Sequence, residues 1–253
     1  MRSVAFALAL AALAGPCAAG GWSVTADLEH FRWREDTSPS VTETGPRVGL
    51  GLGWTQDKAA GWELRYQGRL YFGSVDYTGS LLLSNTPVTG TTDYTGMSHE
   101  VQAVYGFPGS ALGTELVAGL GLDVWNRQLS AVQSEDYSVV YLRLGAALGR
   151  RARSGWYGGG GVKFPLSVEE DAHFPDIGFQ PNPHLEPKGE ASLYAEVGYR
   201  FDERLSAAAY YDSYRFGESN AVNVIEAGTG NAFSFFQPKS SVDILGLRLR
   251  YRF

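Results

Sequence analysis

The sequence predicts an all-β protein: one antiparallel transmembrane β-barrel of about ten strands, with eight to twelve as the range that the pattern allows. Ten segments alternate apolar and polar residues with a period of two, which is the signature of strands whose two faces meet different surroundings. After residue 19, no apolar run is long enough to cross a membrane as a helix. The 32 glycines, 14 tyrosines and 13 phenylalanines among 253 residues also favour strands and turns over helices.

The first 19 residues are predicted to be a cleaved secretory signal peptide. A basic second residue and an apolar run over residues 4–14 precede Cys17-Ala18-Ala19, whose small residues are typical of a cleavage site. Cleavage after Ala19 leaves residues 20–253 as the barrel domain, with no cysteine. In the alternative, Cys17 accepts a lipid, although Pro16 departs from the small residue usual at that position.

Ten alternating segments define the predicted strands. The first is the weakest, with Trp22, Val24 and Leu28 on its apolar face, and the last is clear because leucines alternate with arginines from Leu245 onward. In chain order the segments cover residues 22–33, 48–54, 62–72, 97–107, 112–124, 140–148, 156–168, 191–201, 205–211 and 245–253.

In most of these strands, one face carries the charged side chains and the other carries none. In a soluble barrel the apolar face would fill the interior, but two features favour the inverse arrangement. The apolar rows run for about 9 to 12 residues, as tilted strands that cross a bilayer do. Tryptophans also lie near strand ends, where aromatic girdles meet lipid headgroups: Trp22, Trp54, Trp62 and Trp156 at one end, Trp33 and Trp125 at the other. We therefore expect the apolar face to contact lipid.

The predicted connections alternate in length along the chain. Short links cover residues 56–61, 108–111, 150–155 and 202–204, and longer ones cover 35–46, 74–96, 126–136, 169–189 and 217–240. Four short and five long links join ten strands with both termini on the short-turn side, a pattern typical of membrane barrels. Residues 81–91 are either a hairpin above the membrane or a strand pair that raises the count to twelve.

The signal peptide, the alternating segments and the terminal Leu249-Arg250-Tyr251-Arg252-Phe253 together resemble the bacterial outer-membrane β-barrel proteins. The resemblance covers the whole mature chain and implies residence in the outer membrane of a Gram-negative-type bacterium, in contact with its lipid. A final Phe253 after alternating apolar residues is similar to the signal read by the barrel-assembly machinery. Because many functions share such barrels, the resemblance is specific for architecture and says little about activity.

The polar faces, projected inward, give a balanced set of charges. Paired charges in a narrow lumen indicate either a packed polar core or a small selective ion path; a wide diffusion channel is excluded because such channels use about 16 to 18 strands. We expect Arg248 or Arg250 to meet Asp27 and Glu29 where the last strand closes on the first. The inward acidic residues are Asp27, Glu29, Glu63, Glu100, Glu115, Asp123, Glu190, Glu196 and Asp212, and the basic ones are Arg47, Arg65, Arg69, Arg143, Lys163, Arg200, Arg248, Arg250 and Arg252.

Motifs that carry chemistry are incomplete. The glycine run at 158–161 lacks the Lys-Ser/Thr and the helix of a nucleotide-binding loop. Asp171-Ala172-His173 resembles half of the omptin protease site, but the Asp-x-Asp half is absent, as is the His-x-Ser pair of lipid A deacylases. His30 and His99 are expected at the outer ends of strands, while His173 and His184 lie in an acidic loop that is either a cation or general-base site or simply solvated.

The sequence therefore predicts a non-enzymatic outer-membrane barrel with a small porin-like or a structural and surface-interaction role. A hydrolase with a site near Asp171 and His173, or an adhesin that binds through its loops, is the alternative. Residues 220–237 are unusually apolar for a loop, which suggests a partner surface or packing over the barrel mouth. No catalytic residue, cofactor or metal is predicted, and a pI near 5.3 with a net charge of −6 argues against nucleic-acid binding.

Overall fold

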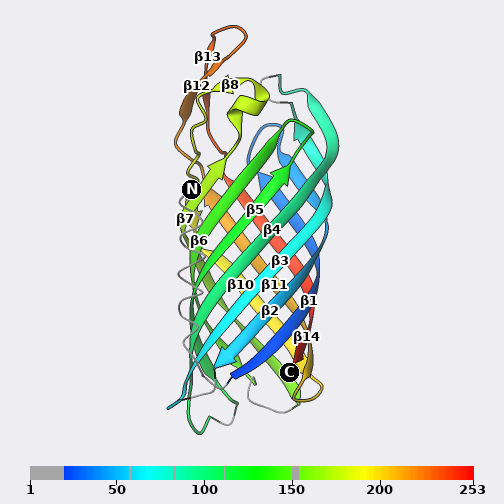
Figure 1. The fold of residues 1–253 in the computed structure, drawn as a ribbon, viewed down its shortest axis with the longest axis vertical. Helices are drawn as coiled ribbons and strands as arrows, with labels where there is room; N and C mark the ends of the chain where they lie inside the picture. The colour runs from blue at the N-terminus through cyan, green and yellow to red at the C-terminus, as the bar shows by residue number, and fades with distance from the viewer. Residues whose placement is uncertain (1–19, 57–58, 82–83, 111, 150–153) are drawn as a thin grey trace.

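Ten long antiparallel strands close into a single barrel, which confirms the predicted fold class and strand number (Figure 1). The computed structural model describes residues 20–56, 59–81, 84–110, 112–149 and 154–253, so the predicted signal peptide lies outside the described residues. Neighbouring strands pair in chain order and β14 pairs with β1 to close the sheet. The ten strands are β1 (Gly20–Glu35), β2 (Val41–Gln56), β3 (Trp62–Ser80), β4 (Pro87–Gly106), β5 (Glu115–Gln128), β6 (Ser134–Leu148), β7 (Gly155–Asp171), β10 (Ser192–Arg200), β11 (Leu205–Gly217) and β14 (Ser240–Arg252).

The strands extend further on the external side than the apolar rows predicted. Strands β3 and β4 pair from Trp62 with Tyr105 out to Ser80 with Pro87, so residues 74–96 form a hairpin that continues these two strands. The outward row of β3 changes from Phe72 to Ser74 and Asp76 at this level, because the strands leave the apolar layer while backbone pairing continues. Residues 81–91 therefore add no strand to the wall.

The outward face carries an apolar belt with an aromatic girdle at its periplasmic end. Of the four tryptophans predicted there, Trp22, Trp62 and Trp156 are exposed and Trp54 is half-buried. The prediction for the other rim was wrong: Trp33 and Trp125 are 0% and 7% exposed and point into the lumen. Both residues belong to the inward-facing row of their strands. Strand alternation therefore determines that they point inward, although tryptophan is also the residue typical of an outer girdle.

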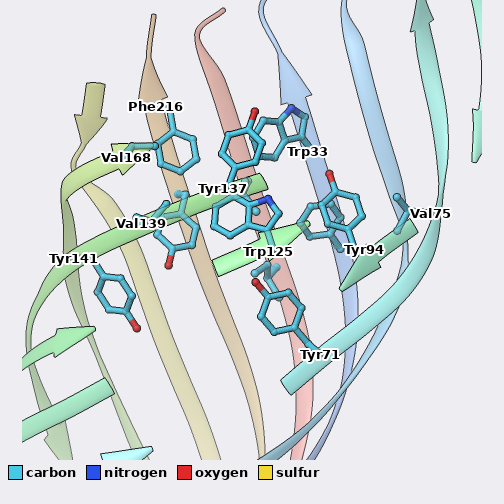
Figure 2. Packing of buried hydrophobic residues seen from close by; sticks show 14 of the residues in the cluster. Trp33, Tyr71, Val75, Tyr94, Trp125, Tyr137, Val139, Tyr141, Val168 and Phe216 are labelled. Carbon is cyan, nitrogen blue, oxygen red and sulfur yellow. The ribbon is translucent and has the colours of Figure 1, made fainter. Parts of the chain in front are cut away.

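A cluster of buried aromatic and aliphatic side chains packs inside the lumen (Figure 2). The rings of Trp125 and Tyr137 stack with centroids 5.0 Å apart, and Trp33 meets Tyr137 edge-on at 5.4 Å. Tyr214 stacks on Phe216 at 5.5 Å. The buried members of this cluster are Phe31, Trp33, Tyr71, Val75, Tyr94, Trp125, Tyr137, Val139, Tyr141, Val168, Tyr210, Tyr214, Phe216, Val242 and Ile244. We refer to this cluster as the aromatic seal.

Inward tyrosines pack over inward glycines of the adjacent strand. A Cβ atom added to Gly121 would lie 2.2 Å from Cζ of Tyr141, and one added to Gly246 would lie 2.4 Å from Cζ of Tyr210. Only glycine leaves room for the ring at such positions, which accounts for part of the high glycine content. The run at residues 158–161 likewise belongs to a strand, β7, and forms no nucleotide-binding loop.

The two longest external segments build a small structure of their own beyond the barrel rim (Figure 1). Strands β8 (Phe179–Gln180), β12 (Val222–Glu226) and β13 (Ala232–Phe235) form a three-stranded sheet beside a 3-10 turn, η1 (Phe174–Ile177), while β9 (Lys188–Glu190) pairs with β11. Within 220–237, Val222, Val224, Phe233 and Phe235 pack against Phe174, Phe179 and Leu185. Their packing explains part of the unusual apolar content of the loop, while Ile225 and Phe236 are exposed.

Candidate binding cavity in the barrel lumen

A cavity of about 720 Å³ extends through the lumen from the periplasmic turns up to the aromatic seal, many of whose residues line it. Its lining begins at residues of the periplasmic turns, including Pro108, Glu203 and Arg204, which are exposed. It ends at Trp33 and Trp125 of the aromatic seal. The cavity is therefore open toward the periplasm and roofed by aromatic rings on the external side.

All of the charged residues predicted for the lumen except Glu190 lie in or beside this cavity. All of the thirteen residues selected from the sequence line it except Lys163, which is fully buried in the barrel interior. Glu190, also expected to point inward, is exposed on β9, with Oε2 3.6 Å from Nζ of Lys239. The prediction for Glu190 failed because the chain breaks its alternation between β9 and β10. The lining residues from that selection are Glu63, Arg65, Arg69, Glu100, Glu115, Asp123, Arg143, Glu196, Arg200, Asp212, Arg248 and Arg250.

The seam between the first and last strands holds a group of five charges. Arg248 binds Asp27 with two parallel hydrogen bonds, Nε to Oδ1 at 2.8 Å and Nη2 to Oδ2 at 2.9 Å. The expectation that Arg248 or Arg250 meets Asp27 and Glu29 is confirmed for Arg248 and Asp27. Arg69 reaches across β2 to the same carboxylate, with Nε 2.8 Å from Oδ2, and also binds Glu29. Arg47 completes the group, with Nη2 3.0 Å from Oε2 of Glu29. Such forked guanidinium–carboxylate pairs fix both distance and orientation.

A second group joins strands on the opposite side of the barrel. Lys163 donates to Oδ1 of Asp212 at 2.7 Å and lies 3.4 Å from the ring centroid of Tyr214. Arg143 bridges Asp212 and Glu100, at 3.2 Å to each carboxylate. Because each charge has a partner of opposite sign, this arrangement offsets the cost of removing the charges from water.

A third group lies closer to the periplasmic mouth. Arg65 donates from Nη2 to Oε2 of Glu115 at 2.8 Å and also binds Glu63 on its own strand. Deeper in the lumen, Asp123 accepts hydrogen bonds from the hydroxyl groups of Tyr71 at 2.7 Å and Tyr214 at 3.0 Å. The three groups together lock the relative positions of strands far apart in sequence.

The sequence did not reveal a further cluster above the apolar belt, around Arg127. Its guanidinium group lies 2.6 Å from Glu135, 2.9 Å from Glu43 and 3.1 Å from Glu35. Burial raises the pKa of Glu135, and it raises that of nearby Glu170 well above its ordinary value. The signal that would have found the cluster is the inward alternation, which continues past the last apolar residues of each strand.

The loop residues Asp171 and His173 do lie together, with Asp136 of β6. His173 Nε2 is 2.9 Å from Oδ2 of Asp136, and Asp171 Oδ1 accepts the backbone N–H of His173 at 3.0 Å and an amide hydrogen of Asn182 at 2.9 Å. Partial burial lowers the pKa of His173, but the hydrogen bond to Asp136 and the charge of Asp171 outweigh it, so the net shift is upward. In the described part of the chain, no His, Cys, Asp and Glu group has a metal-binding arrangement.

The two histidines expected at the outer ends of strands lie inside strands instead. His99 lies within β4, where Tyr66 OH is 2.7 Å from its Nδ1 on the outer surface. His30 lies within β1, 3.4 Å from the hydroxyl of Thr44. The expectation was wrong because it took the end of the apolar row as the end of the strand.

A closed antiparallel barrel with a charged interior and an apolar outer belt defines the class of bacterial outer-membrane β-barrel proteins. In the part of this chain that the structure describes, no helix has the length and apolar character needed to span a membrane. No protein-family profile matches the sequence, and no curated protein matches it either.

Solved structures of this class are similar in fold. The outer membrane protease OmpT from Escherichia coli has 10% sequence identity and a TM-score of 0.49, covering 92% of this chain and 96% of that chain. The transport unit of the autotransporter AIDA-I from Escherichia coli has 12% identity and a TM-score of 0.47, covering 94% and 92%. Neisserial surface protein A has 13% identity and a TM-score of 0.35, covering 93% and 99%. At these identities the similarity concerns architecture alone.

Proposed function

We propose that the protein is a non-enzymatic outer-membrane barrel with a structural and surface-interaction role, and that it does not conduct ions. The aromatic seal carries this proposal. It packs Trp33, Tyr94, Trp125 and Tyr137 within the lumen beside the cavity, and close-packed protein interiors contain few voids larger than a water molecule.

The test is the electrical conductance of the refolded barrel in a planar bilayer. We expect a folded, inserted barrel to be silent, because a hydrated ion would have to displace the aromatic seal. Reproducible conductance steps would overturn the sealed-lumen proposal and favour the small porin-like role. Neutralising Arg65 or Glu196, both of which line the cavity, would then change the ion selectivity if the path runs through the lumen.

The hydrolase alternative rests on the contact between His173 and Asp136 beside Asp171. We expect His173→Ala to leave every measured hydrolytic activity of outer-membrane preparations unchanged, since the sequence lacks the Asp-x-Asp half of the omptin-like site that would activate water together with this histidine. Loss of an activity against peptide or lipid ester substrates would contradict the non-enzymatic proposal, provided that the variant inserts normally.

The proposal also includes export through a cleaved signal peptide and insertion by the barrel-assembly machinery. Phe253 supports the second point: its side chain is exposed at the periplasmic rim, and its backbone N–H donates to the carbonyl oxygen of Trp22 at 2.9 Å. A Phe253→Ala variant is expected to accumulate unassembled, as measured by heat-modifiable migration of membrane fractions.

A further inference from the structure

The charges that line the cavity are balanced in number but not in exposure. In most of the ion pairs, the guanidinium group faces the open space and the carboxylate lies behind it. The side chains of Arg143, Arg65, Arg248 and Arg69 are 18%, 16%, 12% and 11% exposed. Their carboxylate partners are less exposed, at 0% for Asp27 and Glu29, 1% for Glu115, 7% for Glu63 and 9% for Glu100.

Five lining carboxylates depart from this pattern. Asp202 and Glu203 are exposed at the periplasmic mouth, and half-buried Asp123 accepts hydrogen bonds from Tyr71 and Tyr214. The other two are Asp212 and Glu196. Asp212 is 25% exposed, but it is held between Lys163 and Arg143, and Glu196 is 13% exposed, 3.8 Å from Arg248. Asp212 and Glu196 therefore each have a cation at their side. In the remaining ion pairs inside the mouth, the guanidinium group is the partner that a molecule in the cavity meets, although nine acidic and nine basic residues line the wall.

The guanidinium groups are also held in place by aromatic rings. Arg143 lies 4.3 Å from the ring centroid of Tyr194, Arg248 lies 4.6 Å from that of Tyr210, and Arg69 lies 4.9 Å from that of Tyr71. Stacked and ion-paired guanidinium groups lose little side-chain entropy when they bind an additional oxyanion. The cavity is thus preorganised for carboxylate or phosphate oxygens.

We propose that this cavity is a binding site for small organic anions that enter from the periplasm. A carboxylate or phosphate group contacts the guanidinium groups, and an aromatic or apolar portion lies against the tyrosine rings. The volume of about 720 Å³ falls within the range of pockets that hold small molecules. The inference goes beyond the proposed function, because it assigns a ligand class to a lumen otherwise regarded as structural.

Calorimetric titration of the refolded barrel in a neutral detergent tests the ligand class. Phenyl phosphate and benzoate are the anionic probes, and protonated benzylamine and benzyl alcohol are matched cationic and neutral controls. We expect both anions to bind, phenyl phosphate more tightly, and the affinity to fall as salt rises. Binding of phenyl phosphate alone would restrict the ligand to phosphate esters. Equal binding of benzylamine, or no binding of either anion, would overturn the proposal.

Variants then test the location of the site. Arg143→Gln is expected to weaken phenyl phosphate binding roughly tenfold or more, as loss of a charge-assisted hydrogen bond does. If that variant fails to fold, Arg252→Gln decides, because Arg252 is exposed at the periplasmic end of the cavity lining. Arg34→Gln, on the outward face of β1, is the matched control and is expected to bind normally. Unchanged affinity in the folded cavity variants would contradict the inference.

Conductance and binding are separate measurements, so their failures are distinguishable. A barrel that conducts but binds phenyl phosphate would refute the sealed lumen and leave the anion site in place. A barrel that neither conducts nor binds either anion would support the sealed lumen and refute the anion site.

Discussion

At the scale of single residues, Lys163 shows how the barrel tolerates a buried charge. Its ammonium group is fully buried, hydrogen-bonded to Asp212 and in contact with the ring of Tyr214. Breaking a buried pair from one side leaves the other charge without its partner, which costs more than the pair contributes when intact.

We therefore expect Lys163→Met to lower the free energy of unfolding by about 3 kcal/mol. This value is at the low end for a broken buried pair because Arg143 still contacts Asp212 after the change. Urea-induced unfolding of the barrel in vesicles measures the effect. Lys239→Met is the matched control, because Lys239 is exposed and lies 3.6 Å from Glu190, where an ion pair contributes little. Equal destabilisation by both substitutions would contradict this explanation.

His173 provides a prediction about pH. Burial opposes the charge of His173, but the hydrogen bond with Asp136 and the nearby Asp171 raise its pKa above the ordinary value of 6.5. Protonated His173 therefore stabilises the loop. That contribution is complete below pH 6.5 and is lost as the pH rises through the higher pKa of the folded state.

Amide exchange in residues 171–182, followed across this pH range, is the measurement. Protection is expected to fall as the pH rises, and His173→Gln is expected to remove the pH dependence. A variant loop that keeps the same pH dependence would assign the effect to another group.

At the scale of strands, tight packing between tyrosines and glycines determines which pairs of strands fit together. Gly121 on β5 accepts the ring of Tyr141 from β6, with no space for a Cβ atom. Gly121→Ala is expected to destabilise the barrel by about 1–3 kcal/mol, because Tyr141 must leave its position beside Glu100.

Gly90 on β4 offers a matched control, since a Cβ atom there would meet no atom within 4 Å. Gly90→Ala is expected to be neutral or slightly stabilising, because alanine loses less backbone entropy on folding than glycine does. Unfolding midpoints of the two variants in urea give the comparison. A neutral Gly121→Ala would show that the ring moves aside without loss.

Strand alternation was predictable from the sequence, whereas the extent of each strand was not. Asp27 and Arg248 are 221 positions apart, yet their contact follows from the closure of the last strand on the first. The contact of Arg127 with Glu43 could not be predicted in this way. Its prediction would require the register of four strands and the knowledge that the barrel continues above the apolar belt. The positions of Trp33 and Trp125 were predicted wrongly because a tryptophan near the end of an apolar row can belong either to the outer girdle or to the lumen. Residue type alone does not distinguish the two faces.

At the scale of the whole molecule, the cavity extends through the lumen up to the aromatic seal. We expect the double variant Trp33→Ala, Trp125→Ala to open a path and to produce conductance steps that the parent lacks, because two large rings are removed from the roof of the cavity. Planar-bilayer recording with Trp156→Ala, a substitution in the outer girdle, as control makes the comparison. A silent but correctly folded double variant would mean that other members of the seal are sufficient to close the lumen.

A chamber with its opening on one side has a thermodynamic consequence of its own. In the sealed lumen that we propose, the contents exchange only with the compartment that the opening faces, so the equilibrium occupancy follows the periplasmic concentration of a solute and is independent of the medium outside the cell. Under that proposal, no gradient across the membrane drives net transfer through the lumen, however steep the gradient is. The aromatic roof at Trp33 and Trp125 thus determines whether the lumen equilibrates with the periplasm alone or connects the periplasm with the external medium.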